Sequence, residues 1–182
     1  MEFDVLGWPP DGPTLELDYR RFSYAGKFVT PRTGKAVAHE DGEIVAAVCF
    51  NEDRTDGETL WLRYVTVRTD RRGEGIAPRL IARVEAAARD RGFESIKIAV
   101  NNPFAYQALY RAGFGYTGEK TGLAELVLAV PGNRSTEAYR AGLDVFRARD
   151  DITDEERSFL ESKYESGPPS MLARVDERRS HC

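Results

Sequence analysis

The chain has 182 residues, of which 41% are apolar and 31% charged, as expected of one ordinary globular domain that folds without a disulfide or metal. Its 26 basic and 30 acidic residues give a net charge of −4, which argues against nucleic acid as a partner. No apolar run approaches the length of a membrane span, and the acidic opening, interrupted by Pro9 and Pro10, does not resemble a signal peptide. We therefore expect a cytoplasmic protein with no membrane partner.

The first part of the chain is predicted to form strands. Four segments have the alternation or the β-branched and aromatic content of strands: residues 14–24, 35–39, 43–50 and 59–67. In the first of them, Leu15, Leu17 and Tyr19 share one face. The second and third are joined by Asp41-Gly42, a dipeptide that accepts the positive φ angles of a tight hairpin.

The middle of the chain is predicted to alternate between helices and strands. The expected segments are a helix at 75–91, a strand at 95–100, a helix at 102–112, and strands at 114–117 and 123–130. Gly92 and Gly113 supply the left-handed residue at which many helices end. Asn102 is a typical N-cap, and Pro103 follows it at the first helical position.

Beyond residue 133 the strand character ends. Residues 136–149 and 154–165 are predicted helices, and the second opens with a capping box from Thr153 to Glu156. We therefore divide the chain into a domain at 1–133 and a helical extension with a polar tail at 134–182. The apolar residues of the first helix indicate packing against this domain or a homodimer contact.

Cysteine and histidine are too few and too scattered for a metal site. The chain has Cys49, Cys182, His39 and His181, without zinc-type spacing. Cys49 lies in an apolar run and is predicted to be a buried, reduced thiol. We predict no metal.

The most informative stretch is residues 65–77, VTVRTDRRGEGIA, which places a strand, a glycine-bearing turn and a helix start in succession. Unpaired N–H groups at a helix start attract anions, and glycines allow a phosphate to approach the backbone. Arg71 and Arg72 add positive charge. The stretch therefore predicts a diphosphate-binding loop.

Two families of phosphate loop fit this stretch poorly. A dinucleotide-binding fold requires a third glycine where Pro78 stands, and a P-loop requires Gly-Lys-Ser/Thr where Gly75 is followed by Ile76. Residues 113–121 contain partial matches to both motifs, but they lie between a helix and a strand in the wrong order. We interpret them as a turn.

The remaining pattern, Arg-x-x-Gly-x-Ala at residues 72–77, closely resembles the acyl-CoA loop of the GNAT superfamily of N-acyltransferases. The resemblance covers residues 15–130 and includes Asn102-Pro-Phe-Ala105 and Arg111-Ala-Gly113-Phe114. It implies an α/β (α+β) fold with a mixed, mostly antiparallel twisted sheet. This sheet would be splayed between its fourth and fifth strands, with helices on both faces and the C-terminal helical extension.

The resemblance also implies acetyl-CoA as co-substrate. The residues implied to contact it are Val65, Thr66 and Val67 through main-chain atoms, Arg72, Gly73, Glu74, Gly75, Ile76 and Ala77 around the pyrophosphate, and Asn102 and Tyr106. For Asn102, a simple helix cap is an equally good interpretation. Arginine suits a phosphate partner by charge and geometry, which favours Arg72.

The implied reaction is direct transfer of an acetyl group to a primary amine, with a tyrosine protonating the departing thiolate. The family position for this tyrosine falls here on Leu109, so we predict the neighbouring Tyr110 as the general acid. Glu58 is the predicted general base, and His39 is an outside candidate. No base is needed if water relays the proton.

Another departure lies between the first two strands. The family usually has one or two helices there, whereas here only about a dozen residues around 25–32 remain. The acceptor side is therefore expected to be open, or covered by the C-terminal helices or a second subunit. We expect an N-acetyltransferase acting on a small-molecule or peptide amine. The alternative is a non-catalytic acyl-CoA sensor or interaction module.

Overall fold

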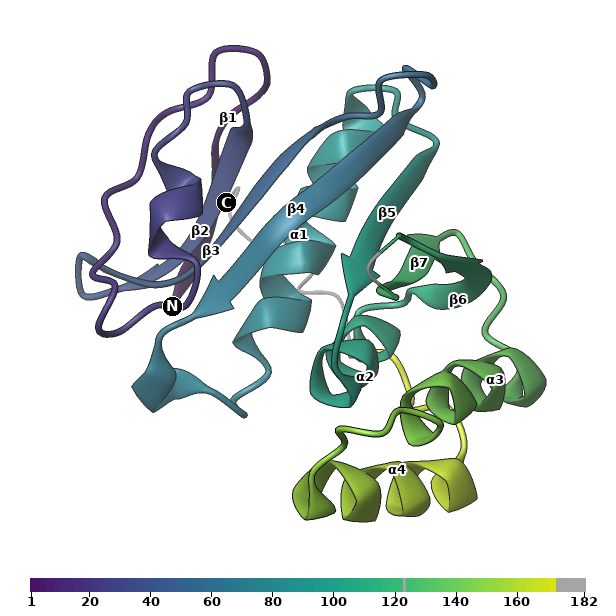
Figure 1. Cartoon of the computed structure of the whole chain (residues 1–182). Coiled ribbons are helices and arrows are strands. Elements are labelled where there is room, and N and C mark those ends of the chain that lie inside the picture. The colour runs from purple at the N-terminus through teal and green to yellow at the C-terminus, as the bar shows by residue number, and fades with distance from the viewer. Residues whose placement is uncertain (123, 173–182) are drawn as a thin grey trace, which may run out of the picture.

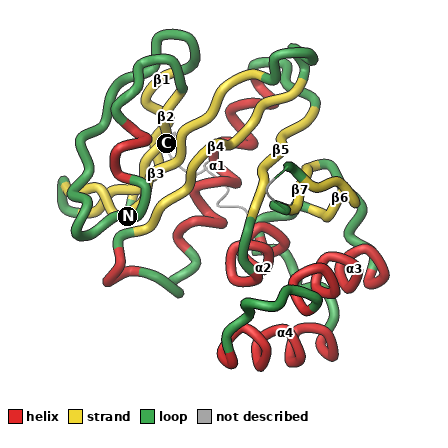
Figure 2. Tube along the Cα trace, in the orientation of Figure 1, coloured by secondary structure: helices red, strands yellow, loops and turns green. Residues whose placement is uncertain are grey.

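The computed structural model describes residues 1–122 and 124–172. Its centre is a seven-stranded sheet in the order β1-β2-β3-β4-β5-β7-β6 (Figures 1 and 2). The strands are β1 (Glu2–Gly7), β2 (Gly34–Glu40), β3 (Glu43–Glu52), β4 (Thr59–Val67), β5 (Ser95–Val100), β6 (Gly115–Lys120) and β7 (Leu126–Val130). The helices are α1 (Ile76–Asp90), α2 (Pro103–Arg111), α3 (Thr136–Arg147) and α4 (Asp154–Ser166). None of the helices in this described part of the chain combines the length and apolar content needed to cross a membrane.

The first strand is not where the alternation at 14–24 predicted it, and that prediction is wrong. The strand is β1, which pairs antiparallel with β2 and turns Phe3 and Val5 toward the core. Residues 14–24 are irregular. Leu15 still packs on the sheet because its apolar side chain covers β2 and β3, but Tyr19 is 82% exposed.

The other predicted elements are present with small shifts at their ends. Asp41 and Gly42 have φ angles of 52° and 80°, as the predicted hairpin between β2 and β3 requires. The capping box at Thr153 and Glu156 is formed at the start of α4. The last two strands are β6 and β7, and Leu123 lies outside the described residues.

The sheet opens beside β4, as the resemblance implied. β4 and β5 run parallel and pair only from Thr59 with Ser95 to Leu62 with Ile98. On its other side, β4 stays paired with β3 up to Val67. Because Cys49 pairs with Tyr64 and Phe50 with Leu62, Arg63 is the extra residue of a β-bulge. The divergence of the two strands is visible in Figure 1.

The two faces of the sheet are covered differently. α1 crosses one face and packs Leu80, Ile81 and Val84 into the main core. The opposite face of β2 and β3 is covered by an irregular segment that contains one 3-10 turn, Ala25–Phe28. Because the first strand is Glu2–Gly7, the connection to β2 spans residues 8–33 and is longer than the dozen residues expected from the sequence. Within this described stretch the one helical element is the 3-10 turn, so no α-helix precedes the second strand.

The C-terminal helices share the main core with the sheet. Tyr139, Leu143 and Phe146 of α3 and Leu160 of α4 belong to the same apolar cluster as the residues of α1 and α2. The apolar face of α3 is thus occupied within the chain, which leaves the predicted homodimer contact without an open surface on that face. The division at residues 133 and 134 stays a prediction, and residues 173–182 of the tail, including His181 and Cys182, lie outside the described part.

Gly142 of α3 is the point of closest approach between the helix and the domain. A Cβ atom there would lie 2.1 Å from the phenol oxygen of Tyr106, whose hydroxyl donates to the carbonyl of Tyr139 at 2.9 Å. An alanine in place of a helical glycine usually stabilises a helix by up to about 1 kcal/mol. Here the added methyl group must displace an anchored ring.

We therefore expect Gly142→Ala to lower the free energy of unfolding by about 1–3 kcal/mol. Urea unfolding followed by circular dichroism measures this change. A Gly142→Ala protein as stable as the parent would contradict the packing of α3 on α2.

Candidate acyl-CoA site

The loop after β4 presents a row of unpaired backbone N–H groups. Gly73 and Gly75 have φ angles of +84° and +73°, a left-handed conformation that glycine adopts without strain. Gly75 is the N-cap of α1. Within the described chain, the N–H groups of residues 72–77 donate no hydrogen bond. The loop therefore offers an anion several donors and the positive end of a 15-residue helix.

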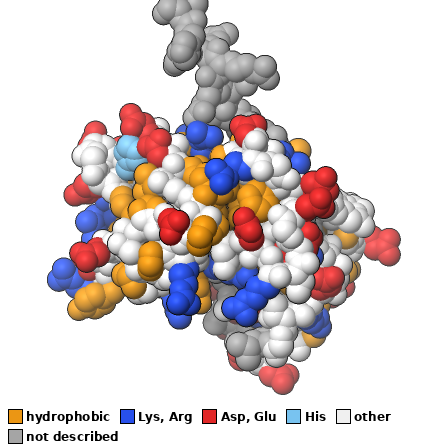
Figure 3. Space-filling model, turned by 90° about the horizontal axis from the view of Figure 1, so that it is seen from above, with side chains coloured by type: hydrophobic (Ala, Val, Ile, Leu, Met, Phe, Trp, Pro, Cys, Tyr) orange, Lys and Arg blue, Asp and Glu red, His pale blue; other side chains and the backbone are white. Residues whose placement is uncertain are grey.

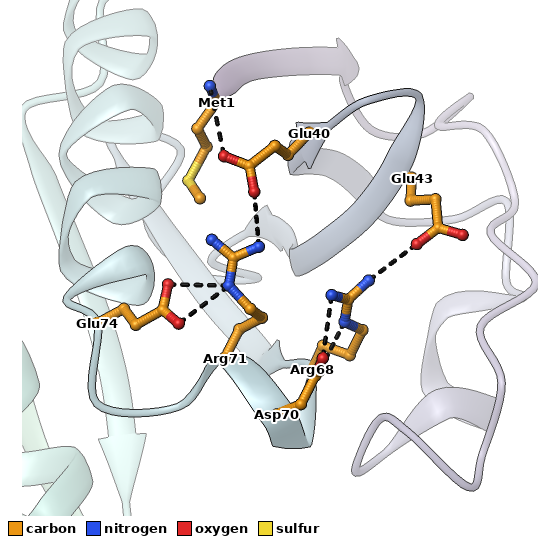
Figure 4. Close-up of polar contacts among 7 residues, drawn as sticks. All are labelled: Met1, Glu40, Glu43, Arg68, Asp70, Arg71 and Glu74. Carbon is orange, nitrogen blue, oxygen red and sulfur yellow. Dashed lines mark hydrogen bonds and ion pairs between the residues drawn. The ribbon is translucent and has the colours of Figure 1, made fainter.

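Two arginines of the loop are already neutralised by carboxylates (Figure 4). Arg71 donates to Glu40 at 2.7 Å and to Glu74 at 2.9 Å. Arg68 donates to Asp70 at 2.6 Å and to Glu43 at 3.0 Å. These pairs tie the loop to the hairpin of β2 and β3. They hold its shape, and they leave Arg71 less free to bind a phosphate than its charge suggests.

Arg72 and Arg111 have no carboxylate partner among the described residues. Arg72 donates to the hydroxyl of Ser23 at 2.9 Å. Arg111, at the end of α2, comes within 3.8 Å of the position that a Cβ atom on Gly75 would occupy, as does Leu172. The sequence analysis used Arg111 only as a landmark of the family pattern, because its distance to the loop depends on how α1 and α2 pack.

The predicted main-chain contacts lie along the open edge of β4. Beyond Leu62 the strand has no described partner on the β5 side, so backbone groups of Val65, Thr66 and Val67 that point that way are unpaired. The hydroxyl of Thr66 is buried and also lacks a hydrogen-bond partner. The unpaired strand edge fits a long polar ligand lying in the opening.

The three residues predicted on α2 are held by the protein itself. Asn102 accepts a hydrogen bond from the N–H of Ala105 at 2.8 Å, which is the N-cap that its position indicated. Tyr106 and Tyr110 are fully buried, with ring centroids 4.9 Å apart. The oxygen of Tyr110 accepts from the N–H of Tyr116 at 2.9 Å, and burial raises the pKa of Tyr106.

The structure does not bring the predicted acid and base together. Glu58 precedes β4 at the end opposite to Val67, where its carbonyl accepts from Glu94 and Ser95. Eight residues of extended strand separate the two ends by roughly 25 Å. Glu58 is exposed, and neither phenol of α2 reaches the opening as a free group.

His39 lies elsewhere, within 3.6 Å of Glu2 and hydrogen-bonded to Asp4. The ligand atoms of these three residues lie within 4.8 Å of one another, so a cation is geometrically possible there. In the view of Figure 3, a histidine side chain lies at the surface next to acidic side chains. The three groups are exposed or half-buried, and the sequence prediction of no metal is neither supported nor contradicted by them.

A pocket of about 670 Å³ lies on the face of the sheet opposite to α1. Its wall includes Arg63 and Tyr64, which immediately precede the predicted contacts at Val65–Val67. The rest comes from the 3-10 turn, from Thr30 and Thr33 that follow it, from β3 and the loop between β3 and β4, and from Trp61 of β4. We call this the acceptor-side pocket, because the sequence predicts the acceptor on the side of the segment before β2.

The structure thus combines a mixed sheet that opens beside its fourth strand with a glycine-rich start of the following helix. A sequence model described as the acetyltransferase (GNAT) family matches residues 2–116, more than half of the chain. The chain belongs to the GNAT acetyltransferase family. No functionally curated protein matches it.

Several solved structures are similar in fold. Nourseothricin acetyltransferase is 24% identical, with a TM-score of 0.48, and the match covers 56% of this chain and 68% of that one. A PaiA N-acetyltransferase from Thermoplasma acidophilum, in complex with coenzyme A, is 14% identical, with a TM-score of 0.46 and coverages of 52% and 58%. A ribosomal-protein-alanine N-acetyltransferase from Brucella melitensis is 22% identical, with a TM-score of 0.43 and coverages of 53% and 67%. Such distant matches say nothing about the substrates of this chain.

The unpartnered hydroxyl of Thr66 gives a prediction for the stability of the ligand-free protein. A buried hydroxyl without a partner is destabilising, so Thr66→Val should raise the free energy of unfolding by about 1 kcal/mol or leave it unchanged. Chemical unfolding of the ligand-free protein measures this. A loss of more than about 1 kcal/mol would mean that the hydroxyl has a partner in solution.

Proposed function

We propose that this protein is an acetyl-CoA-dependent N-acetyltransferase that transfers an acetyl group to a primary amine. The observation that carries the proposal is the row of unpaired N–H groups at residues 72–77, directly after a strand whose open edge is also unpaired. A diphosphate suits the first feature, and an amide-containing arm suits the second. Both groups occur in one molecule of coenzyme A.

The proposed contacts are ordered along the ligand from its pantetheine arm to its pyrophosphate. Main-chain atoms of Val65, Thr66 and Val67 would hold the pantetheine arm, and the Thr66 hydroxyl is available to it. The amides of residues 72–77 and the side chain of Arg72 would hold the pyrophosphate. Arg111 is added to the set because it lies beside Gly75. Asn102 and Tyr106 are retained as predictions, although Asn102 caps α2 and Tyr106 is buried.

In the proposed reaction the amine nitrogen forms a bond to the acetyl carbon, and the bond from that carbon to sulfur breaks. The amine loses a proton to Glu58 or to water, and the thiolate receives one. A backbone N–H of the open β4 edge would stabilise the negative oxygen of the intermediate. That Tyr110 protonates the thiolate remains a prediction, which its buried position weakens.

The alternative function is binding of acyl-CoA without turnover, as a sensor or interaction module. The observation that favours it is the position of Leu109, which is buried where the family resemblance implies a tyrosine. Release of free thiol from acetyl-CoA in the presence of a panel of amines separates the two functions. Binding without release by any amine would favour the sensor.

Position 73 offers a sharp test of the phosphate loop. Gly73 faces open space, whereas a side chain at Gly75 would meet Arg111 and Leu172. Asparagine and aspartate both tolerate positive φ and have the same shape, so Gly73→Asn is the matched control for Gly73→Asp. We expect Gly73→Asp to bind acetyl-CoA at least about tenfold more weakly than Gly73→Asn, because a carboxylate repels the pyrophosphate.

Calorimetric titration with acetyl-CoA measures the two affinities, with ATP and NAD as ligands that should bind neither variant nor the parent. Equal affinities of the two variants would place the diphosphate elsewhere. Tight binding of ATP or NAD by the parent would favour a nucleotide-binding function instead.

Tyr110→Phe tests whether the phenol works in the reaction or in the fold. The substitution leaves the buried N–H of Tyr116 without its acceptor, so we expect a loss of about 1–3 kcal/mol in unfolding free energy. We expect kcat to change by less than about fivefold, because the phenol has no open path to the ligand. A folded variant whose kcat falls a hundredfold, with an altered alkaline limb of the pH profile, would support the general-acid prediction.

A further inference from the structure

The acceptor-side pocket carries the opposite charge to the chain as a whole. Its wall contains the cations Lys27, Arg54 and Arg63 and one carboxylate, that of Asp53, so three positive charges face one negative charge. The chain has a net charge of −4. A pocket that is positive within a negative protein selects its ligand by charge.

The one carboxylate of the pocket is already saturated with hydrogen-bond donors. Asp53 accepts from the N–H and the hydroxyl of Thr55, from the N–H of Asp56 and from the indole N–H of Trp61. These donors lower its pKa to about 2. The carboxylate therefore fixes the turn and Trp61, and it makes no ion pair with the pocket arginines in the described chain.

Arg63 is the cation best placed to bind a ligand. It is the bulge residue of β4, and its Nε donates to the neutral side chain of Asn51 at 2.6 Å while its guanidinium lies 5.1 Å over the ring of Trp61. Partial burial lowers the pKa of this guanidinium. No carboxylate of the described chain pairs with it, so its terminal N–H groups are available.

A second uncompensated cation lies beneath the pocket. Lys35 is fully buried, and its ammonium donates to the carbonyls of Thr30 and Thr33 and to the hydroxyl of Thr33 at 2.7–2.8 Å. Its three protons are thus satisfied, but among the described residues no carboxylate balances its charge. Thr30 and Thr33 form part of the pocket wall, so an anion there would be attracted by Lys35 as well.

We infer that the acceptor is a small amine that also carries an anionic group, a carboxylate or a phosphate-type group, and that Arg63 binds this group. The inference rests on the proposed acetyl transfer and names the substrate class for the same site. The pocket volume of about 670 Å³ is in the range that takes a small molecule. An amino acid has this chemistry, with an amine and an anion a few atoms apart.

The test compares ligands with and without an anionic group. Phenylalanine and alanine are offered as acetyl acceptors, each as the free acid, as the primary amide and as the aminophosphonate analogue. Separately, N-acetylphenylalanine and its amide are titrated into the protein, and fluorescence of Trp61 in the pocket wall reports binding without any turnover. The variants are Arg63→Gln, Arg63→Lys and, as a matched control, Arg157→Gln at an exposed arginine of α4.

We expect the anionic acceptors to have a kcat/KM at least about tenfold higher than the amides, and the anionic ligand to bind at least about tenfold more tightly than its amide. A hydrogen bond to a charged group is strong enough to give this difference. Arg63→Gln should abolish that preference, Arg63→Lys should retain part of it, and Arg157→Gln should retain all of it. The acid and phosphonate series show which anion is preferred.

Equal use of acids and amides by the parent, or an unchanged preference in Arg63→Gln, would overturn the inference while leaving acetyl transfer intact. Failure to bind acetyl-CoA or to acetylate any amine would instead contradict the proposed function. In that event the titration with N-acetylphenylalanine and its amide still tests the inference, because it needs no turnover. Equal affinities for the two ligands would overturn it.

Discussion

Backbone pairing between β4 and β5 ends at Leu62, and every part of the proposed site depends on this loss of pairing. Unpaired backbone groups inside a sheet are unfavourable, so the opening must be held apart by the structure around it. At the same place the bulge at Arg63 adds a residue to β4, and the pairing with β3 continues on both sides of the bulge with its register shifted by one residue. The same bulge directs Arg63 into the acceptor-side pocket. The opening therefore begins next to the residue that supplies a cation to that pocket.

Charge is distributed around this opening in an ordered way. Arg68 and Arg71 form ion pairs with carboxylates of the hairpin of β2 and β3, and these pairs fix the loop between β4 and α1 against that hairpin. The binding capacity of the loop is therefore that of its backbone N–H groups, supplemented by Arg72 and Arg111. In the acceptor-side pocket the acidic group is the one already engaged. The carboxylate of Asp53 accepts from the indole of Trp61, whereas Arg63 donates to the neutral side chain of Asn51 and is available to a ligand.

The features that the sequence predicted well are those decided by local chemistry. The hairpin at Asp41-Gly42, the end of α1 at Gly92, the cap at Asn102 and the capping box at Thr153 each follow from a few adjacent residues. The prediction at residues 14–24 failed because alternation alone does not show whether a partner strand is present, and β2 pairs instead with the short segment Glu2–Gly7. The bulge at Arg63, the approach of Arg111 to Gly75 and the buried Lys35 all depend on contacts between distant segments. No local pattern marks them.

The C-terminal helices and the missing tyrosine at the opening have a common explanation. Position 109 of α2 is apolar, and the two phenols of this helix lie on the side that faces α3 and β6. There the hydroxyl of Tyr106 is satisfied by the carbonyl of Tyr139, and the oxygen of Tyr110 by the N–H of Tyr116. Buried phenols require such partners, so the extension at α3 and the aromatic side of α2 stabilise one another. With those phenols engaged in the core, the proposed acetyl transfer would rely on the backbone N–H groups of β4 and on water for its protons, which matches a site built mainly from main-chain groups.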